Sequence, residues 1–164
     1  MFGSLASMVS RRFERCPLFR EPNILGPTDG SRTIARATDI FTGGIGNGFG
    51  ELDVPSGEVT PEMHFFLCSR PQGIDCRCIP NLTRESVAAT QHQLVNFGEE
   101  YLSDLFEERG MEIWFPFRSA NNLYLAGLYL RQGHPAIRLI PLPSHTSAAV
   151  VRDGYHRVVI LQHP

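Results

Sequence analysis

TRESVAATQHQLVNFGEEYLSDLFEER, residues 83–109, is the stretch of this sequence that decides its fold. Apolar side chains recur through it at the spacing of an amphipathic helix that buries one face. Asn81 and Thr83 offer capping oxygens before it, and Gly110 is typical of the position just past a helix end. The predicted apolar face comprises Val87, Gln91, Leu94, Tyr101, Leu102, Leu105 and Phe106. We therefore expect one long helix as the spine of the core, either broken or closely approached by other backbone at Gly98.

The sequence on both sides of this helix is typical of β-strands. Residues 31–40 alternate, and residues 63–68 form a short apolar run with 74–79 as the expected hairpin partner. Further strands are predicted at 111–117, 122–131, 136–142 and 155–162, with an edge or bulge position for Pro116. Six or seven strands against one helix at 83–109 predict an α+β fold with a mostly antiparallel sheet.

Length and composition favour one globular domain. The chain has 164 residues, of which 42% are hydrophobic and 20% are charged. Residues 1–30 differ from the rest, being rich in Ser and Arg and ending in a Pro/Gly loop. We expect an N-terminal arm or short amphipathic helix at 1–30 that adds little to the core of a single domain at 31–164. The expected location is the cytoplasm, with a mitochondrial presequence or a secreted-effector leader as alternatives for the arm.

Charge and hydropathy argue against two partner classes. The net charge is −2 and no basic stripe is visible, so nucleic acid is not expected as a partner. No apolar run approaches the roughly 18 residues that a membrane span needs. All fifteen basic residues counted as Lys or Arg are arginines. The absence of lysine suits either an arginine-rich codon usage or selection against ubiquitin attachment in a host cell.

Cysteine and histidine spacing does not predict a metal site. His64, Cys68, Cys76 and Cys78 lack the paired C-x2–4-C spacing of structural zinc sites. A Cys–His nucleophile is also not indicated, because neither Cys16 nor Cys68 stands at a predicted helix N-terminus. No metal and no cofactor are predicted.

The glycine-rich segment 43–50 is the main candidate for an enzyme feature. Its glycines fit neither G-x-G-x-x-G nor the lysine-containing phosphate loop. It is expected to be an ordinary mobile loop or a lid over a ligand.

Candidate binding residues lie in the C-terminal third. Arginines stand there near the ends of the predicted strands, with Trp and Tyr residues nearby. Arg, Trp and Tyr dominate binding hot spots, and a shared face would suit a carboxylate-rich protein partner. The predicted binding residues are Trp114, Arg118, Tyr124, Tyr129, Arg131 and Arg138.

The order of elements between about residues 35 and 150 resembles the suppressor-of-fused-like domain family. The counterparts are ATDIFTGGIG, PEMHFFLCSR, the helix at 83–109, RGMEIWF and IRLIPLP. This sequence departs from the family by its extra glycines and by SHTSAA after LIPLP, where an acidic residue is expected. The resemblance implies a non-catalytic protein-binding domain, of the kind proposed to neutralise bacterial toxins.

Two functions follow as hypotheses. The first is a protein-interaction domain, such as an immunity or adaptor protein. The alternative is a small enzyme or a lysine-free secreted effector with segment 43–50 as its lid.

Overall fold

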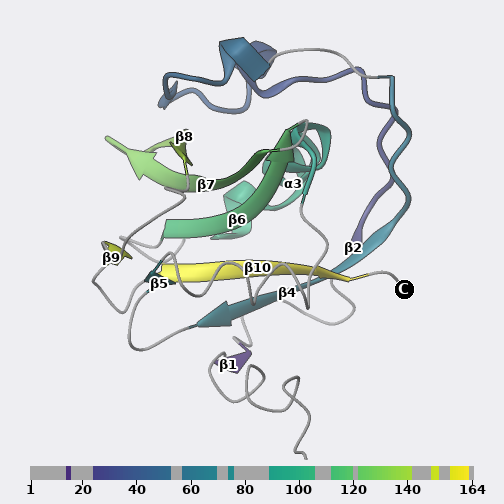
Figure 1. The fold of residues 1–164 in the computed structure, drawn as a ribbon. Coiled ribbons are helices and arrows are strands. Elements are labelled where there is room, and N and C mark those ends of the chain that lie inside the picture. Colours follow the sequence, from purple (N-terminus) through teal and green to yellow (C-terminus); the bar gives the residue numbers. More distant parts are fainter. Residues whose placement is uncertain are drawn as a thin grey trace, which may run out of the picture.

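The structure is a computed structural model, and its arrangement is α+β, as the sequence predicts. It describes residues 14–15, 24–52, 57–69, 74–75, 89–105, 112–119, 122–141, 149–151 and 156–162. The one helix among these residues, α3 (Gln91–Leu105), packs on a curved sheet (Figure 1). No helix in the described part of the chain is long and apolar enough to cross a membrane.

The main sheet has eight strands among the described residues, rather than the six or seven expected. They are β1 (Glu14–Arg15), β2 (Ile24–Leu25), β3 (Gly44–Ile45), β4 (Met63–Ser69), β6 (Glu112–Ser119), β7 (Asn122–Arg131), β8 (His134–Pro141) and β10 (His156–Gln162). The order is β1-β4-β10-β6-β7-β8-β3, and β2 also pairs with β4. The pairings β10–β6 and β3–β8 are parallel and the others are antiparallel. The last strand, β10, therefore joins β4 to the hairpins of the C-terminal third.

Two predicted elements are wrong in detail. β5 (Ile74–Asp75) pairs with β9 (Ala149–Val151) in a separate sheet, and not with β4 as the expected hairpin requires. Within the predicted strand 31–40 the chain forms a 3-10 helix, η1 (Ile34–Arg36), followed by a turn. Ile34, Ala37 and Phe41 recur there at helical spacing and are all buried, which explains the turn.

Helix α3 begins at Gln91 rather than at residue 83. Thr90 and Gln93 form a reciprocal capping box. Thr90 Oγ1 accepts a hydrogen bond from the backbone N–H of Gln93 at 3.3 Å, and Gln93 Oε1 accepts one from the backbone N–H of Thr90 at 2.9 Å. Ala89 is not available to a helix, because its backbone bonds β6 through Pro116 O and the Arg118 amide. The expected caps at Asn81 and Thr83 and the helix end near 109 lie outside the described residues.

Gly98 lets neighbouring side chains come close to α3, which continues unbroken through it. A Cβ at this position would lie 3.0 Å from Ile40 and 3.2 Å from the ring of Phe41. Of the two alternatives for Gly98, the structure shows close packing instead of a break.

The core lies between α3, the sheet and the segment 31–52. Leu94 and Leu102 of α3 are buried, as predicted, while the Leu105 side chain lies outside the described residues. Aromatic rings make up much of the core, with Phe97 packed edge-on against Phe65 at 5.3 Å and Phe115 at 4.6 Å. These contacts hold α3 to both β4 and β6.

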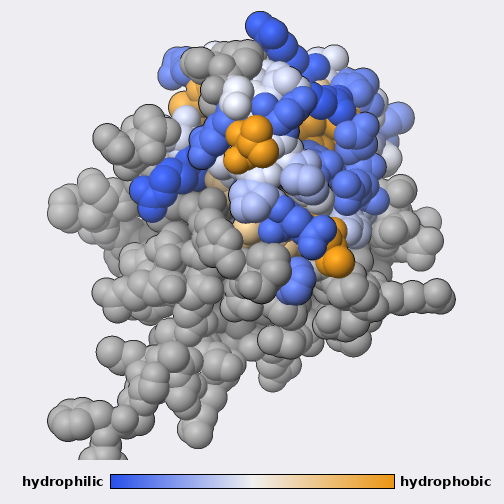
Figure 2. Space-filling view, turned by 90° about the vertical axis from the view of Figure 1, so that its right-hand side faces the viewer, coloured by the Kyte–Doolittle hydropathy of each residue, from blue (hydrophilic) through white to orange (hydrophobic). Residues whose placement is uncertain are grey.

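Residues 24–30 belong to the packed structure. They run beside residues 57–63 to form an arch from β2 to the segment 31–52 (Figure 1), with Thr28 paired to Thr60. Leu25 has no exposed surface, so our expectation that residues 1–30 add little to the core is wrong for Leu25. The face seen in Figure 2 is mostly hydrophilic where it is described, and Val59 is the single exposed large hydrophobic side chain in the described part of the chain.

Candidate functional site

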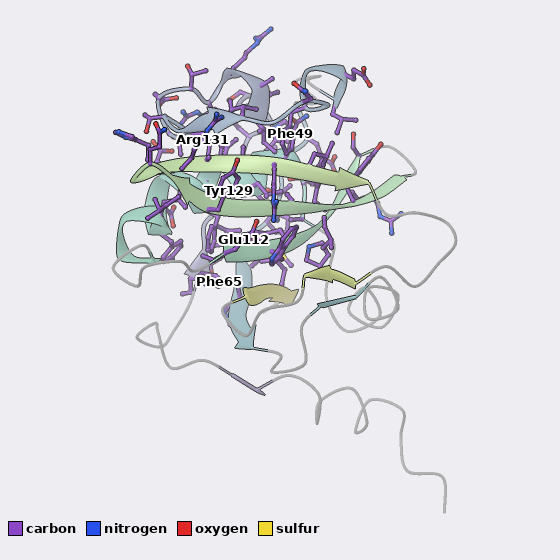
Figure 3. The ribbon with its side chains drawn as sticks, turned by 90° about the vertical axis from the view of Figure 1, so that its left-hand side faces the viewer. Phe49, Phe65, Glu112, Tyr129 and Arg131 are labelled. Atoms are coloured by element: carbon purple, nitrogen blue, oxygen red, sulfur yellow. The ribbon has the colours of Figure 1, made fainter. Side chains whose placement is uncertain are left out.

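The strands β6, β7 and β8 have two different faces. Ile113, Phe115 and Phe117 of β6 face the core, so the alternating residues between them face away from α3. We call this second surface the outer face; by register it carries Glu112, Trp114, Gly127, Tyr129, Arg131 and Arg138. Figure 3 labels Glu112, Tyr129 and Arg131 on β6 and β7.

The centre of the outer face is an ion pair flanked by two aromatic rings. Arg138 Nη2 lies 2.6 Å from Glu112 Oε1. The guanidinium of Arg138 stands 5.1 Å from the ring centre of Trp114 and 5.5 Å from that of Tyr129. Both distances are within the range of cation–π attraction. Three side chains, two from β6 and one from β7, therefore hold the guanidinium of Arg138 in place.

Burial and charge act in opposite directions on Glu112. Its side chain is only 11% exposed, whereas that of Arg138 is 46% exposed. Burial raises the pKa of Glu112 above its usual value, and the neighbouring Arg138 lowers it by a smaller amount. The carboxylate is thus a buried support, and the guanidinium is the part that solvent or a partner reaches.

Gly127 makes this contact possible. It lies on β7 between Trp114 and Arg138 in the strand register. A Cβ there would stand 3.0 Å from Glu112 Oε1 and 3.1 Å from the Trp114 ring. A side chain at Gly127 would therefore press on the Glu112 carboxylate and on the Trp114 ring, the two groups of β6 that contact Arg138.

The structure brings some of the predicted binding residues together. Tyr129, Arg131 and Arg138 share the outer face, with Arg131 exposed and Tyr129 half-buried. Trp114 lies beneath Arg138 and is fully buried, so it supports the surface without being exposed on it.

Two predicted binding residues lie apart from this group. Arg118 belongs to the outer face by strand alternation, but it is exposed at the far end of β6, where its backbone amide donates to Ala89 O. Tyr124 is on the core side, with its ring 5.5 Å from that of Phe117. Glu112 was missed by the sequence analysis, because only the register across three strands places it beside Arg138.

The glycine-rich segment 43–50 is attached to the sheet edge. The Gly43 amide donates to Pro135 O at 2.7 Å, and the Gly46 amide donates to Ile137 O at 2.8 Å. Phe49 is buried beside Phe117, with ring centres 6.3 Å apart. The segment therefore adds the edge strand β3 to β8.

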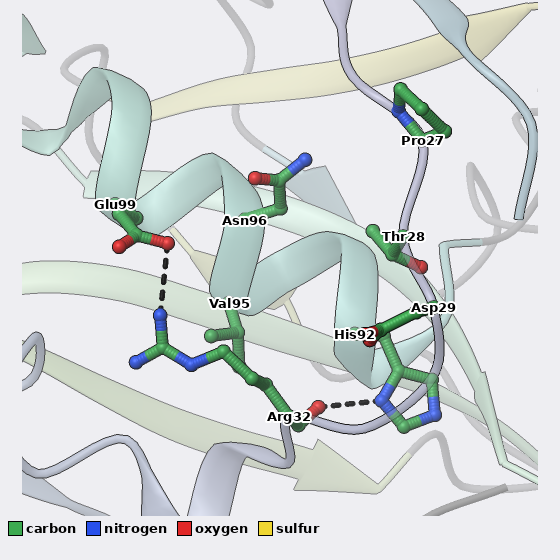
Figure 4. A pocket seen from close by; sticks show the side chains of 8 residues that line it. All are labelled: Pro27, Thr28, Asp29, Arg32, His92, Val95, Asn96 and Glu99. Atoms are coloured by element: carbon green, nitrogen blue, oxygen red, sulfur yellow. Dashed lines mark hydrogen bonds and ion pairs between the residues drawn. The ribbon is translucent and has the colours of Figure 1, made fainter. Parts of the chain in front are cut away.

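A separate pocket of about 300 Å³ lies between α3 and the arch. Its lining residues are Pro27, Thr28, Asp29, Arg32, His92, Val95, Asn96 and Glu99 (Figure 4). His92 is buried, and its Nδ1 lies 2.5 Å from Arg32 O. Because a carbonyl oxygen can only accept, Nδ1 carries the hydrogen and the tautomer of the neutral ring is set.

This pocket does not contain the geometry of a nucleophilic triad. Ser31 Oγ donates to Asp29 Oδ1 at 2.5 Å, so the hydroxyl is bonded to the acid and not to the imidazole of His92. Within the described ranges, no three His, Cys, Asp or Glu side chains converge as metal ligands. Cys76 and Cys78 lie outside those ranges.

Comparison with known proteins adds no relative. No family model, no curated protein and no solved structure matches this chain.

Proposed function

We propose that this chain is a non-catalytic protein-interaction domain, of the immunity or adaptor kind, that binds an acidic surface of another protein through its outer face. The observation that carries the proposal is the half-exposed guanidinium of Arg138, which Glu112, Trp114 and Tyr129 hold in place. A side chain that is already ordered loses little conformational entropy on binding. Arginine also suits carboxylates, because its planar fork can donate two parallel hydrogen bonds.

Neighbouring residues extend this cationic surface. Arg131 is exposed, and within the described part of the chain it makes no ion pair. Its register partner is the exposed His134, while Arg138 pairs with Gly127. The two arginines are therefore four positions apart along the hairpin, or roughly 14 Å at the usual rise of a strand. Tyr129 lies between them, and Arg and Tyr are enriched at the centres of protein interfaces.

The resemblance to suppressor-of-fused-like domains supports the same kind of function. The alternative of a small enzyme or effector depends on segment 43–50 acting as a lid. We favour binding, because the hydrogen bonds of Gly43 and Gly46 to β8 give this segment a role in the sheet.

The proposal is tested by capturing partners from the source cells with the whole chain and with matched arginine variants. Arg131→Ala removes an exposed guanidinium from the outer face, whereas Arg36→Ala removes one from η1. We expect a specific partner protein that the parent chain and Arg36→Ala bind equally. Arg131→Ala should weaken its binding about tenfold, the usual effect of losing one hot-spot side chain.

Purified proteins then decide the outcome. Binding that falls steeply with salt, and that Arg131→Ala reduces more than Arg36→Ala, supports an acidic partner at the outer face. Equal affinity for all three chains would contradict the proposal, as would a partner whose binding site carries a basic surface.

A further inference from the structure

The pocket between α3 and the arch has a lining whose hydrogen-bond donors are largely used within the protein. Arg32 Nη1 donates to Glu99 Oε2 at 2.9 Å, and Arg32 Nη2 donates to Asp39 Oδ2 at 3.1 Å. The Nδ1 hydrogen of His92 goes to Arg32 O, and Asn96 Nδ2 donates to Gly26 O at 3.1 Å. A ligand therefore finds few donors there.

Acceptors remain on the same walls. Among the described residues, the bonds to Asp29 reach its Oδ1, and the bond to Glu99 reaches its Oε2. Each carboxylate thus keeps a second oxygen, and the Asn96 amide keeps its carbonyl oxygen. Figure 4 shows these side chains on two sides of the pocket, with Asn96 and Glu99 on α3 and Asp29 on the arch.

The local charge is negative, and like the free acceptors it favours a ligand that is a cation and a hydrogen-bond donor. The lining carries two carboxylates, those of Asp29 and Glu99, and one guanidinium, that of Arg32, which is paired with Glu99 and also with Asp39 outside the pocket. Hydrogen bonds from Ser31 lower the pKa of Asp29, so this carboxylate stays ionised down to acid pH. The neighbouring Glu100 has a raised pKa, through burial and then through repulsion by Glu99. An anion would be repelled here, and a cation attracted.

We propose that this pocket binds the primary ammonium group of a small organic cation or of a lysine side chain, between Asp29 and Glu99. The volume of about 300 Å³ is at the lower end of the range for ligand sites. Val95 and Pro27 supply apolar wall for the carbon chain that carries the ammonium. The chain itself contains no lysine, so no lysine of a second copy can fill the pocket. This site is separate from the outer face and does not depend on the function proposed above.

The test is an NMR titration of the whole chain with three probes of similar size: butylammonium, 1-butanol and butyrate. We expect saturable shifts at the amides of Thr28, Asp29, Asn96 and Glu99 with butylammonium alone. Asp29→Asn should weaken this binding about tenfold, because it removes a charged acceptor. Asn can keep the turn to Ser31, so the loop is preserved in this variant. Glu62→Gln removes the same charge from an exposed position that does not line the pocket and should leave the affinity unchanged.

A lysine capped at both ends distinguishes the two sources of the ammonium group. Tighter binding of capped lysine than of butylammonium assigns the pocket to a lysine of a partner protein, and the reverse assigns it to a free amine. Equal shifts with butyrate, or unchanged affinity in Asp29→Asn, would overturn the inference. Arg131→Ala should leave butylammonium binding intact, so failure at one site is distinguishable from failure at the other.

Discussion

Glu112 Oε1 and Arg138 Nη2 lie 2.6 Å apart, although the whole of β7 runs between their strands. The contact passes over Gly127, the one position of β7 that has no side chain to block it. Glu112 of β6, Gly127 of β7 and Arg138 of β8 therefore depend on one another for this ion pair.

Removing the Arg138 guanidinium should destabilise the fold, because the Glu112 carboxylate stays buried without its ion-pair partner. Arg138→Ala leaves Glu112 buried without its cation, and we expect a loss of about 1–3 kcal/mol in the free energy of unfolding. This is less than for a fully buried pair, because Arg138 is half-exposed. Denaturant unfolding measures the loss. In the double variant with Glu112→Gln the loss should be smaller than the sum of the single losses; strict additivity would mean that the pair is not coupled.

The raised pKa of Glu112 makes a prediction about pH. A carboxyl whose pKa is higher in the folded state favours folding when protonated, and this contribution is lost as the pH rises through that pKa. As the pH rises above the ordinary value of 4.5, the parent chain should lose stability relative to Glu112→Gln. Unfolding curves of both chains across this range provide the measurement. A difference that stays constant with pH would show that Glu112 titrates normally.

Gly127→Ala should be clearly destabilising. Its Cβ would press on Glu112 and on the buried Trp114 ring, and overpacking of this kind costs about 1–3 kcal/mol. Gly50→Ala is the matched control, since no atom lies within 4 Å of a Cβ at Gly50. Thermal unfolding should separate the two variants. Equal midpoints would contradict the close approach at Gly127.

Leu25→Ala tests whether the segment before residue 31 is part of the core. Truncating a fully buried leucine typically costs about 2–5 kcal/mol, so a large fall in stability is expected. Val59→Ala also shortens an aliphatic side chain of the arch, but at a position 73% exposed, and should have little effect. A small effect for both would restore the boundary at residue 30 that composition suggests.

The helix start is tested by two threonines. Thr90→Ala removes the hydroxyl of the capping box and should cost about 0.5–2 kcal/mol. Thr83→Ala removes the cap that the sequence analysis predicted and should cost less. The opposite ranking would place the start of the helix upstream of Gln91.

Local patterns predicted the elements better than their partners. The bounds of β7 were predicted as 122–131 and are Asn122–Arg131, because alternating residues and turn signals on both sides are local features. Gln132 and Gly133 have positive φ angles of 52° and 83°, which form the two-residue turn to β8. Thr90 and Gln93 match the sequence pattern of a capping box. The helix start was nevertheless missed, because the apolar spacing continues upstream of Thr90.

The candidate site could be predicted only in part. Arginine and aromatic residues drew attention to Tyr129, Arg131 and Arg138, which do share a face. Tyr124 was assigned to the same surface, but the β-strand alternation puts it on the core side. The pocket could not be predicted, since it depends on how the arch, far from α3 in sequence, lies against His92 and Asn96.

The central place of β10 has a consequence for how this protein is made. β4 ends at Ser69, but its main partner begins only at His156. Ribosomes add about 5–20 residues per second, so a nascent chain keeps one long edge of β4 uncovered for several seconds. Long-range pairing of this kind is also slow to form after synthesis. Until β10 pairs with it, this edge of β4 presents unpaired backbone groups at which another chain can add a strand.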